Sequence, residues 1–171
     1  MSTGGGSWVV RDSLLIGSHD ADDRQYGHLI SDSTYADFII RIRFKILQGN
    51  SGFYFRMVKE GAGGVSGLQA EISKDGRTGG LWETNGRGWV SLPREEEVAL
   101  WFRPDDWNEL VIRAKGKEIK VWTNDVLSAI FSDDDPRFQG WQNGHLAVQL
   151  HGDEDVEVWI SSIEIREIQG I

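Results

Sequence analysis

Asn50–Glu83 reads NSGFYFRMVKEGAGGVSGLQAEISKDGRTGGLWE, and this stretch decides the fold. Successive side chains of a β-strand point to opposite faces, so alternation of apolar and polar residues predicts a half-buried strand. The first run has Phe53, Phe55 and Met57 on its apolar face, with Tyr54 and Arg56 opposite. The second run has Leu68, Ala70 and Ile72 on its apolar face, with Gln69, Glu71 and Ser73 opposite. Neighbouring strands of this kind pack a core with one face and offer polar side chains to a ligand with the other.

The same alternation continues on both sides of this stretch. Asp37–Leu47 alternates apolar with charged residues, which is typical of an antiparallel strand with one face in solvent. Asp12-Ser13 is predicted to turn an N-terminal hairpin, and Asp75-Gly76 and Asn85-Gly86 are dipeptides that favour two-residue hairpin turns. The apolar positions of the last strand change phase at Ser161-Ser162, which predicts a β-bulge.

About a dozen such strands with almost no helix predict an all-β fold, a two-sheet antiparallel sandwich. The one helical signal is a single turn at Glu95–Ala99, and the longest predicted loop is the acidic segment Ser132–Asn143. With 171 residues and no internal repeat, the chain is predicted to form a single domain over residues 1–171.

Composition argues against several classes of function. The net charge of −9 and the lack of a basic cluster argue against a nucleic-acid partner. The chain has no Cys, which excludes disulfides, zinc–thiolate sites and thiol catalysis. Acidic residues gather at Asp20–Asp23, Glu95–Glu97, Asp133–Asp135 and Asp153–Asp155, which predicts solvated loops, with calcium binding as the alternative.

The sequence shows no segment for membrane insertion. Its longest apolar run, Val98–Phe102, is too short to span a bilayer. The first residues, MSTGGGS, lack the basic and apolar regions of a signal peptide, so the chain as written is expected in the cytoplasm. An extracytoplasmic location is the alternative if this Gly-rich start was trimmed from a longer protein. The sequence indicates no oligomeric state.

The candidate site lies on the polar face of these strands. His151 shares a strand face with Gln149, and beside the first two runs that face would collect Arg56, Glu71 and His151. A cation, a carboxylate and a group that titrates near neutrality suit general acid–base chemistry. The alternative interpretation is an Arg56–Glu71 salt bridge with a structural His151. The strand sequence EISK that begins at Glu71 lacks the closely spaced further carboxylates of retaining glucanases, which argues against a paired-carboxylate glycosidase.

Trp82 and Trp141 lie beside Gly-rich or polar loops. An exposed indole stacks on the apolar face of a sugar ring, whereas a buried indole belongs to the core. Both roles are open from the sequence alone.

Five motifs, in this order and spacing, resemble the 3-keto-disaccharide hydrolase domain family. They are GNSGFYFR at 49–56, LQAEI at 68–72 with TGGLWE at 78–83, DWNELVIRAKGKEIKVWTN at 106–124, GHLAVQLHG at 144–152 and VWISSIEIREI at 158–168. The resemblance implies a concanavalin-like jelly roll with its site on the concave face. It also implies a bacterial protein that acts on sugars whose C3 hydroxyl has been oxidised to a ketone. The matching candidate catalytic residues are Arg56, Glu71 and His151. The candidate saccharide contacts are Tyr54, Gln69, Trp82, Glu83, Trp141 and Gln149.

Two functions remain as predictions. In the first, the chain cleaves a 3-keto-glycoside by removing the hydrogen on C2, which the neighbouring ketone acidifies, followed by elimination or hydration. Either Glu71 or His151 is the base, and Arg56 or a divalent metal ion, the one cofactor considered, faces the enolate oxygen. In the second, the same face is a lectin-like module that holds a glycan without converting it.

Overall fold

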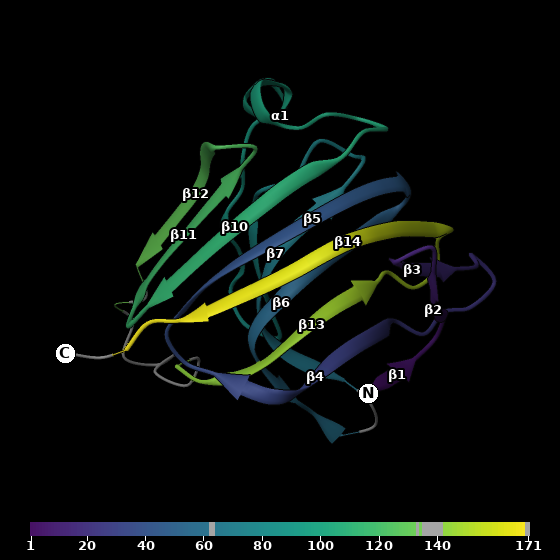
Figure 1. The fold of residues 1–171 in the computed structure, drawn as a ribbon, viewed down its shortest axis with the longest axis horizontal. Coiled ribbons are helices and arrows are strands. Elements are labelled where there is room, and N and C mark those ends of the chain that lie inside the picture. Colours follow the sequence, from purple (N-terminus) through teal and green to yellow (C-terminus); the bar gives the residue numbers. More distant parts are fainter. Residues whose placement is uncertain (62–63, 133, 135–141, 170–171) are drawn as a thin grey trace.

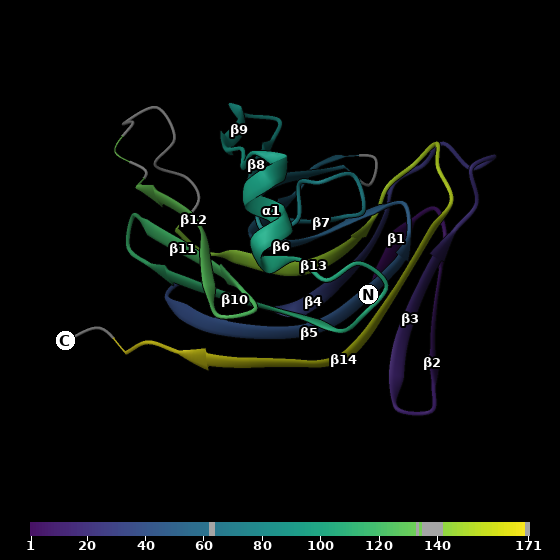
Figure 2. The same ribbon diagram turned by 90° about the horizontal axis from the view of Figure 1, so that it is seen from above.

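The computed structural model describes residues 1–61, 64–132, 134 and 142–169, which form two β-sheets stacked face to face (Figure 1, Figure 2). Their elements, in chain order, are β1 Ser2–Gly4, β2 Ser7–Arg11, β3 Leu14–His19, β4 Gly27–Tyr35, β5 Phe38–Gln48, β6 Asn50–Lys59, β7 Val65–Ser73, β8 Leu81–Thr84, β9 Gly88–Ser91, α1 Glu95–Trp101, β10 Asn108–Lys115, β11 Glu118–Thr123, β12 Val126–Ser132, β13 Gly144–Leu150 and β14 Val156–Glu167. The first sheet has the order β1-β4-β13-β6-β7-β8-β9, and the second has β12-β11-β10-β5-β14-β3-β2. All pairings are antiparallel.

This arrangement confirms the predicted all-β sandwich. The hydrophobic core fills the space between the sheets, and the alternating residues of the long strands supply it from both sides. Phe44 and Ile42 of β5 enter from the second sheet, while Phe53 of β6 and Leu68 of β7 enter from the first. The opposite face of the first sheet does not contact this core. It carries the side chains that alternate with the core residues along each strand, most of them polar.

The turns and the bulge predicted from the sequence are found at some positions and not at others. Asp12 and Ser13 both have positive φ and turn the β2–β3 hairpin, as predicted, and the register of β14 shifts between Ile160 and Ser162 at the predicted bulge. Asp75-Gly76 and Asn85-Gly86 lie in connections longer than two residues. The first connection runs from Ser73, the end of β7, to Leu81, the start of β8, and the second runs from Thr84, the end of β8, to Gly88, the start of β9.

The helix α1 is longer than the single turn predicted at its N-terminus. Its first turn holds Glu95, Glu96 and Glu97, whose negative charge suits the positive end of the helix dipole. Its last residue, Trp101, is buried, and its indole Nε1–H donates to the backbone oxygen of Thr78 at 2.9 Å. This bond fixes the helix against the connection between β7 and β8.

A β-bulge in β6 reverses the predicted orientation of two side chains. Phe55 pairs with Leu68, but the next partners are Val58 and Ser66, so Arg56 and Met57 together oppose one residue of β7. Arg56 has a φ of 50°, in the left-handed region, at this point. Met57 consequently lies on the outer face of the first sheet, and Arg56 turns away from it. The prediction that Met57 faces the core and Arg56 the polar face is wrong.

Candidate functional site

A pocket of about 830 Å³ opens on the outer face of the first sheet, the face turned away from the second sheet. Its floor is built from side chains that alternate with core residues along β4, β13, β6, β7 and β8. The strand pairing aligns His28, Gln149, Gly52 and Glu71 across four neighbouring strands. The strand that leads to His151 is thus a neighbour of β6, which carries Tyr54, and β6 lies between it and β7, which carries Gln69.

Glu71 is a carboxylate buried in this floor, with 4% of its surface exposed. Its Oε1 accepts a hydrogen bond from Asn50 Nδ2 at 2.5 Å, and its Oε2 accepts one from Gln69 Nε2 at 2.8 Å. Burial raises the pKa of Glu71 to about 7, although both bonds and the nearby charge of Arg77 act in the opposite direction. Glu71 therefore exchanges a proton in the neutral pH range, as a general base or acid requires.

Gly52 makes the arrangement around Glu71 possible. A Cβ at position 52 would lie 2.3 Å from both Cδ and Nε2 of Gln69. The Gln69 side chain thus lies across the space that any larger residue would fill, and from there it reaches the carboxylate. A glycine at position 52 therefore leaves room for the Gln69 side chain, which approaches its Cα closely.

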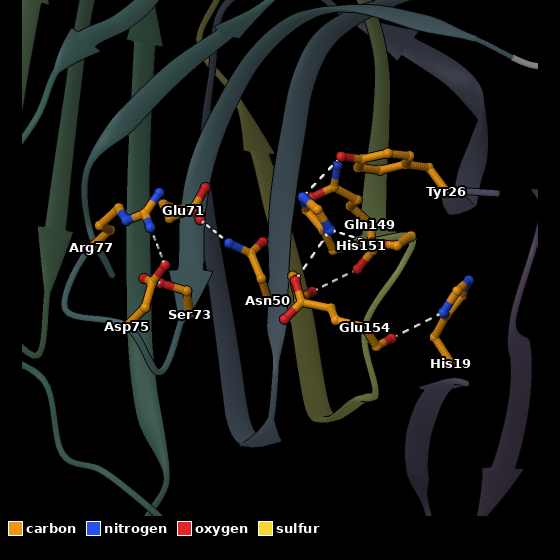
Figure 3. A network of polar contacts seen from close by, with 12 residues as sticks. His19, Tyr26, Asn50, Glu71, Ser73, Asp75, Arg77, Gln149, His151 and Glu154 are labelled. Atoms are coloured by element: carbon orange, nitrogen blue, oxygen red, sulfur yellow. Dashed lines mark hydrogen bonds and ion pairs between the residues drawn. The ribbon is translucent and has the colours of Figure 1, made fainter. Parts of the chain in front are cut away.

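His151 forms a chain of polar contacts with Tyr26 and Glu154 at the other side of the pocket (Figure 3). The hydroxyl of Tyr26 lies 2.8 Å from His151 Nε2. His151 Nδ1 lies 2.7 Å from the backbone oxygen of Gly152 and 3.1 Å from Glu154 Oε1. Figure 3 shows Asn50 between His151 and Glu71, so the two titratable groups face the pocket from opposite sides.

Several polar atoms of the pocket floor have unused hydrogen-bonding capacity. Within the described part of the chain, both ring nitrogens of His28 and the amide oxygens of Asn50, Gln69 and Gln149 are buried without a hydrogen-bond partner. Burial lowers the pKa of His28 to about 4, so this ring is neutral at pH 7. Unsatisfied polar groups of this kind cost free energy, and a ligand rich in hydroxyl groups is suited to satisfy them.

Aromatic side chains bound the end of the pocket at β8 and β9. Trp82 and Trp89 are half-buried, and their rings meet edge to face with centroids 5.2 Å apart. Trp82 is therefore a pocket residue rather than a core residue. Tyr54 is buried behind them, and its hydroxyl shares a 2.7 Å hydrogen bond with Thr84.

Of the sequence-predicted site residues, the structure brings Tyr54, Gln69, Glu71, Trp82, Gln149 and His151 together in the pocket lining. Arg56 is elsewhere: it donates to the backbone oxygens of Ala36 and Gly116 and pairs with Asp37 at 2.9 Å. The predicted grouping of Arg56 with Glu71 and His151 is therefore wrong, because the bulge in β6 changes its direction.

Glu83 also lies outside the pocket lining, although it was predicted as a saccharide contact. It follows Trp82 on β8, so its side chain points to the opposite face, where it is buried and pairs with Arg87 at 2.6 Å. Trp141 lies outside the described residues.

Sequence reasoning missed Tyr26, Asn50, Arg77 and Glu154. Glu154 lies within Asp153–Asp155, which the sequence predicts to be a solvated loop, and Tyr26 follows the acidic segment Asp20–Asp23. Asn50 is the first residue of β6, and its alternation with Gly52 and Tyr54 was the signal that could have placed it on the polar face.

The described residues contain no group of three or more His, Asp or Glu side chains that could hold a metal ion. The part of the chain that is described also contains no helix of the length and hydropathy needed to cross a membrane. Among the described residues, the pocket lining thus holds no such set of metal ligands.

The comparisons with known proteins agree with this fold. A family model described as the 3-keto-alpha-glucoside-1,2-lyase-like domain matches residues 2–166. A search of curated proteins found no match. The carbohydrate-binding module CBM66 from Bacillus subtilis has a TM-score of 0.71 at 14% identity, with 97% of this chain and 95% of that chain covered. A putative glycosyl hydrolase from Parabacteroides distasonis has a TM-score of 0.67 at 19% identity, with 95% and 83% covered. A Bacillus subtilis protein of unknown function with a galectin-like fold has a TM-score of 0.74 at 14% identity, with 98% and 88% covered.

Proposed function

The chain belongs to the 3-keto-alpha-glucoside-1,2-lyase-like domain family, and on this premise we propose that it cleaves the glycosidic bond of 3-keto-glycosides. A ketone at C3 acidifies the hydrogen on C2, so a positioned base can remove that hydrogen as a proton. The electron pair of the C–H bond forms an enolate, whose collapse forms the C1–C2 double bond and expels the oxygen on C1. In the hydration branch, water then adds across this double bond and gives the free 3-keto sugar.

The observation that carries the proposal is Glu71, a buried carboxylate in the pocket floor with a pKa of about 7. We assign Glu71 as the base, since it is partly ionised at neutral pH and still basic enough to accept a proton. His151 belongs to the opposite side, from which the departing oxygen receives its proton. The proposal thus assigns the base to Glu71, where the sequence left Glu71 and His151 as alternatives.

In the proposal Arg77 has the role that the sequence analysis gave to Arg56, the cation that faces the enolate oxygen. It lines the pocket, and its positive charge already lowers the pKa of Glu71. Its guanidinium is held by Asp75 in an ion pair of 2.5 Å. In the proposal this cation stabilises the negative charge that develops on the enolate oxygen.

The test is incubation of the protein with methyl 3-keto-glucoside, followed by mass spectrometry. We expect loss of substrate with the wild type and a rate at least about 100-fold lower with Glu71→Gln, because the amide cannot accept the proton. A parallel incubation with EDTA measures any contribution of a divalent ion. Intact substrate with the wild type, with and without added divalent ions, would contradict the proposal.

A lectin-like binding module is the second candidate. The Trp82–Trp89 pair favours it, because two half-buried indoles at a pocket rim suit stacking against a sugar ring, whether or not the sugar is converted. In that case calorimetry would detect saccharide binding that Trp82→Ala weakens, while the 3-keto-glucoside would remain intact.

A further inference from the structure

We propose that Tyr26 is the proton donor to the departing oxygen, with His151 and Glu154 as the groups that recharge it. This inference rests on the proposed function and extends it to a residue that the sequence did not indicate.

The partners of His151 determine where its protons lie. Nδ1 faces two acceptors, the Gly152 backbone oxygen at 2.7 Å and Glu154 Oε1 at 3.1 Å, so Nδ1 carries a hydrogen. In the neutral ring, Nε2 then accepts the hydroxyl hydrogen of Tyr26 over 2.8 Å. Nε2 of His151 thus faces the Tyr26 hydroxyl, so a proton that passes from Nε2 to a ligand passes through the phenol oxygen.

The position of Tyr26 suits transfer to a ligand opposite Glu71. Tyr26 precedes β4 and lines the pocket beside His151, and Asn50 of β6 separates this pair from Glu71 of β7 (Figure 3). Two strand spacings, roughly 9–10 Å, therefore separate the strand of His151 from the strand of Glu71. In the proposal the sugar ring lies over β6, with the base on one side of it and the acid on the other.

The phenol is suited to give a proton rather than to take one. Burial raises the pKa of Tyr26, and the negative charges of Asp153, Glu154 and Glu71 act in the same direction. A phenol with a raised pKa stays protonated at neutral pH. The carboxylate of Glu154 lies 3.1 Å from Nδ1 of His151, on the side of the ring away from Tyr26.

Each proton that moves in this step has a donor and an acceptor. Before reaction, imidazolium His151 donates its Nε2 hydrogen to the Tyr26 oxygen, and the Tyr26 hydroxyl hydrogen points to the ligand. As Glu71 takes the proton from C2 and the C1–O bond breaks, Tyr26 gives its hydrogen to the departing oxygen and receives the Nε2 hydrogen of His151. The step ends with neutral His151 accepting from the Tyr26 hydroxyl across the same 2.8 Å contact. Solvent then carries the proton of Glu71 back to His151.

Leaving-group dependence tests this role. Methyl 3-keto-glucoside needs an acid because methoxide is a poor leaving group, whereas 4-nitrophenolate departs without one. We expect Tyr26→Phe to lower the rate on the methyl glycoside by about 100-fold or more and to change the rate on the 4-nitrophenyl glycoside by less than about threefold. Tyr35→Phe, at a tyrosine that packs against the core, is the matched control and should retain both rates.

A second measurement separates the acid from the base. In deuterium oxide, a 3-keto sugar that lacks a C1 substituent can exchange its C2 hydrogen but cannot eliminate, and nuclear magnetic resonance follows the exchange. Tyr26→Phe should retain this exchange, while Glu71→Gln should lose it. Equal losses on both glycosides, or loss of exchange in Tyr26→Phe, would overturn the acid role of Tyr26 while the proposed function stands. Inactivity of the wild type on both glycosides would overturn the proposed function and the role of Tyr26 with it.

Discussion

At the scale of single residues, surroundings rather than residue type set the chemistry of this pocket. Glu71 and Glu83 are both buried glutamates on neighbouring strands of the first sheet. Glu83 has an ion pair with Arg87 on the core-facing side of β8, whereas Glu71 has amide donors and a raised pKa in the pocket. The sequence predicted both as site residues, because strand alternation separates the two faces only when the phase of each strand is known.

The first prediction concerns the pH dependence of turnover. Glu71 accepts a proton only when ionised, and its pKa of about 7 means that it is mostly protonated below that pH. The kcat/KM on methyl 3-keto-glucoside should therefore rise about tenfold per pH unit below about pH 6, and this rise should end near pH 7. Steady-state kinetics between about pH 5 and pH 9 measure this profile. A flat profile in this range would argue against Glu71 as the base.

At the scale of elements, the sequence predicts strands well and strand irregularities poorly. The alternation in β5, β7 and β13 correctly predicts which residues enter the core. The bulge at Arg56 leaves no such signal, because both Arg56 and Met57 fit a regular strand as well as a bulged one. Tyr26 and Glu154 were missed for another reason: they lie outside the strands, where no periodicity fixes their direction.

The second prediction concerns the contact between β6 and β7. Gly52→Ala would displace the Gln69 side chain, since the new Cβ would lie 2.3 Å from its Nε2. The hydrogen bond from Gln69 lowers the pKa of Glu71, so its loss should raise that pKa and shift the midpoint of the pH profile upward by about 0.5–1 unit.

A matched variant controls for the general effect of a Gly→Ala change. At Gly61 a Cβ would meet no atom within 4 Å, so Gly61→Ala should leave the midpoint unchanged. An unshifted midpoint in Gly52→Ala would show that Gln69 does not tune Glu71.

At the scale of the whole molecule, the two sheets are joined by polar contacts as well as by the core. Arg56 of the first sheet donates to the backbone oxygen of Gly116, in the β10–β11 turn of the second sheet, at 2.7 Å. It also donates to Ala36, and pairs with Asp37, in the connection from β4 to β5. Arg87 holds Glu83 on the first sheet, and its guanidinium lies 4.9 Å from the ring of Phe131 on β12 of the second sheet. The two-layer architecture could be predicted from alternation, but these contacts between segments distant in sequence could not.

The third prediction separates a structural role of Arg56 from a catalytic one. Arg56→Ala removes donors from two backbone oxygens and the partner of Asp37, while the pocket lining stays intact. We expect the free energy of unfolding to fall by about 2–4 kcal/mol, measured by urea denaturation with Trp fluorescence. The free energy of unfolding of Arg56→Lys should lie between those of the wild type and Arg56→Ala, because one ammonium cannot reproduce the planar arrangement of guanidinium donors. Arg11→Ala, at an exposed position of β2, should change stability by less than about 0.5 kcal/mol.

The same variants distinguish the two roles by activity. If Arg56 ties the sheets together, Arg56→Ala below its unfolding temperature should turn over methyl 3-keto-glucoside within about threefold of the wild-type rate, since Arg56 does not line the pocket that holds Glu71 and His151. A loss of about 100-fold with unchanged stability would restore the catalytic role that the sequence alone predicted. Stability lost with activity retained identifies Arg56 as the residue through which the β6 bulge fixes one sheet to the other.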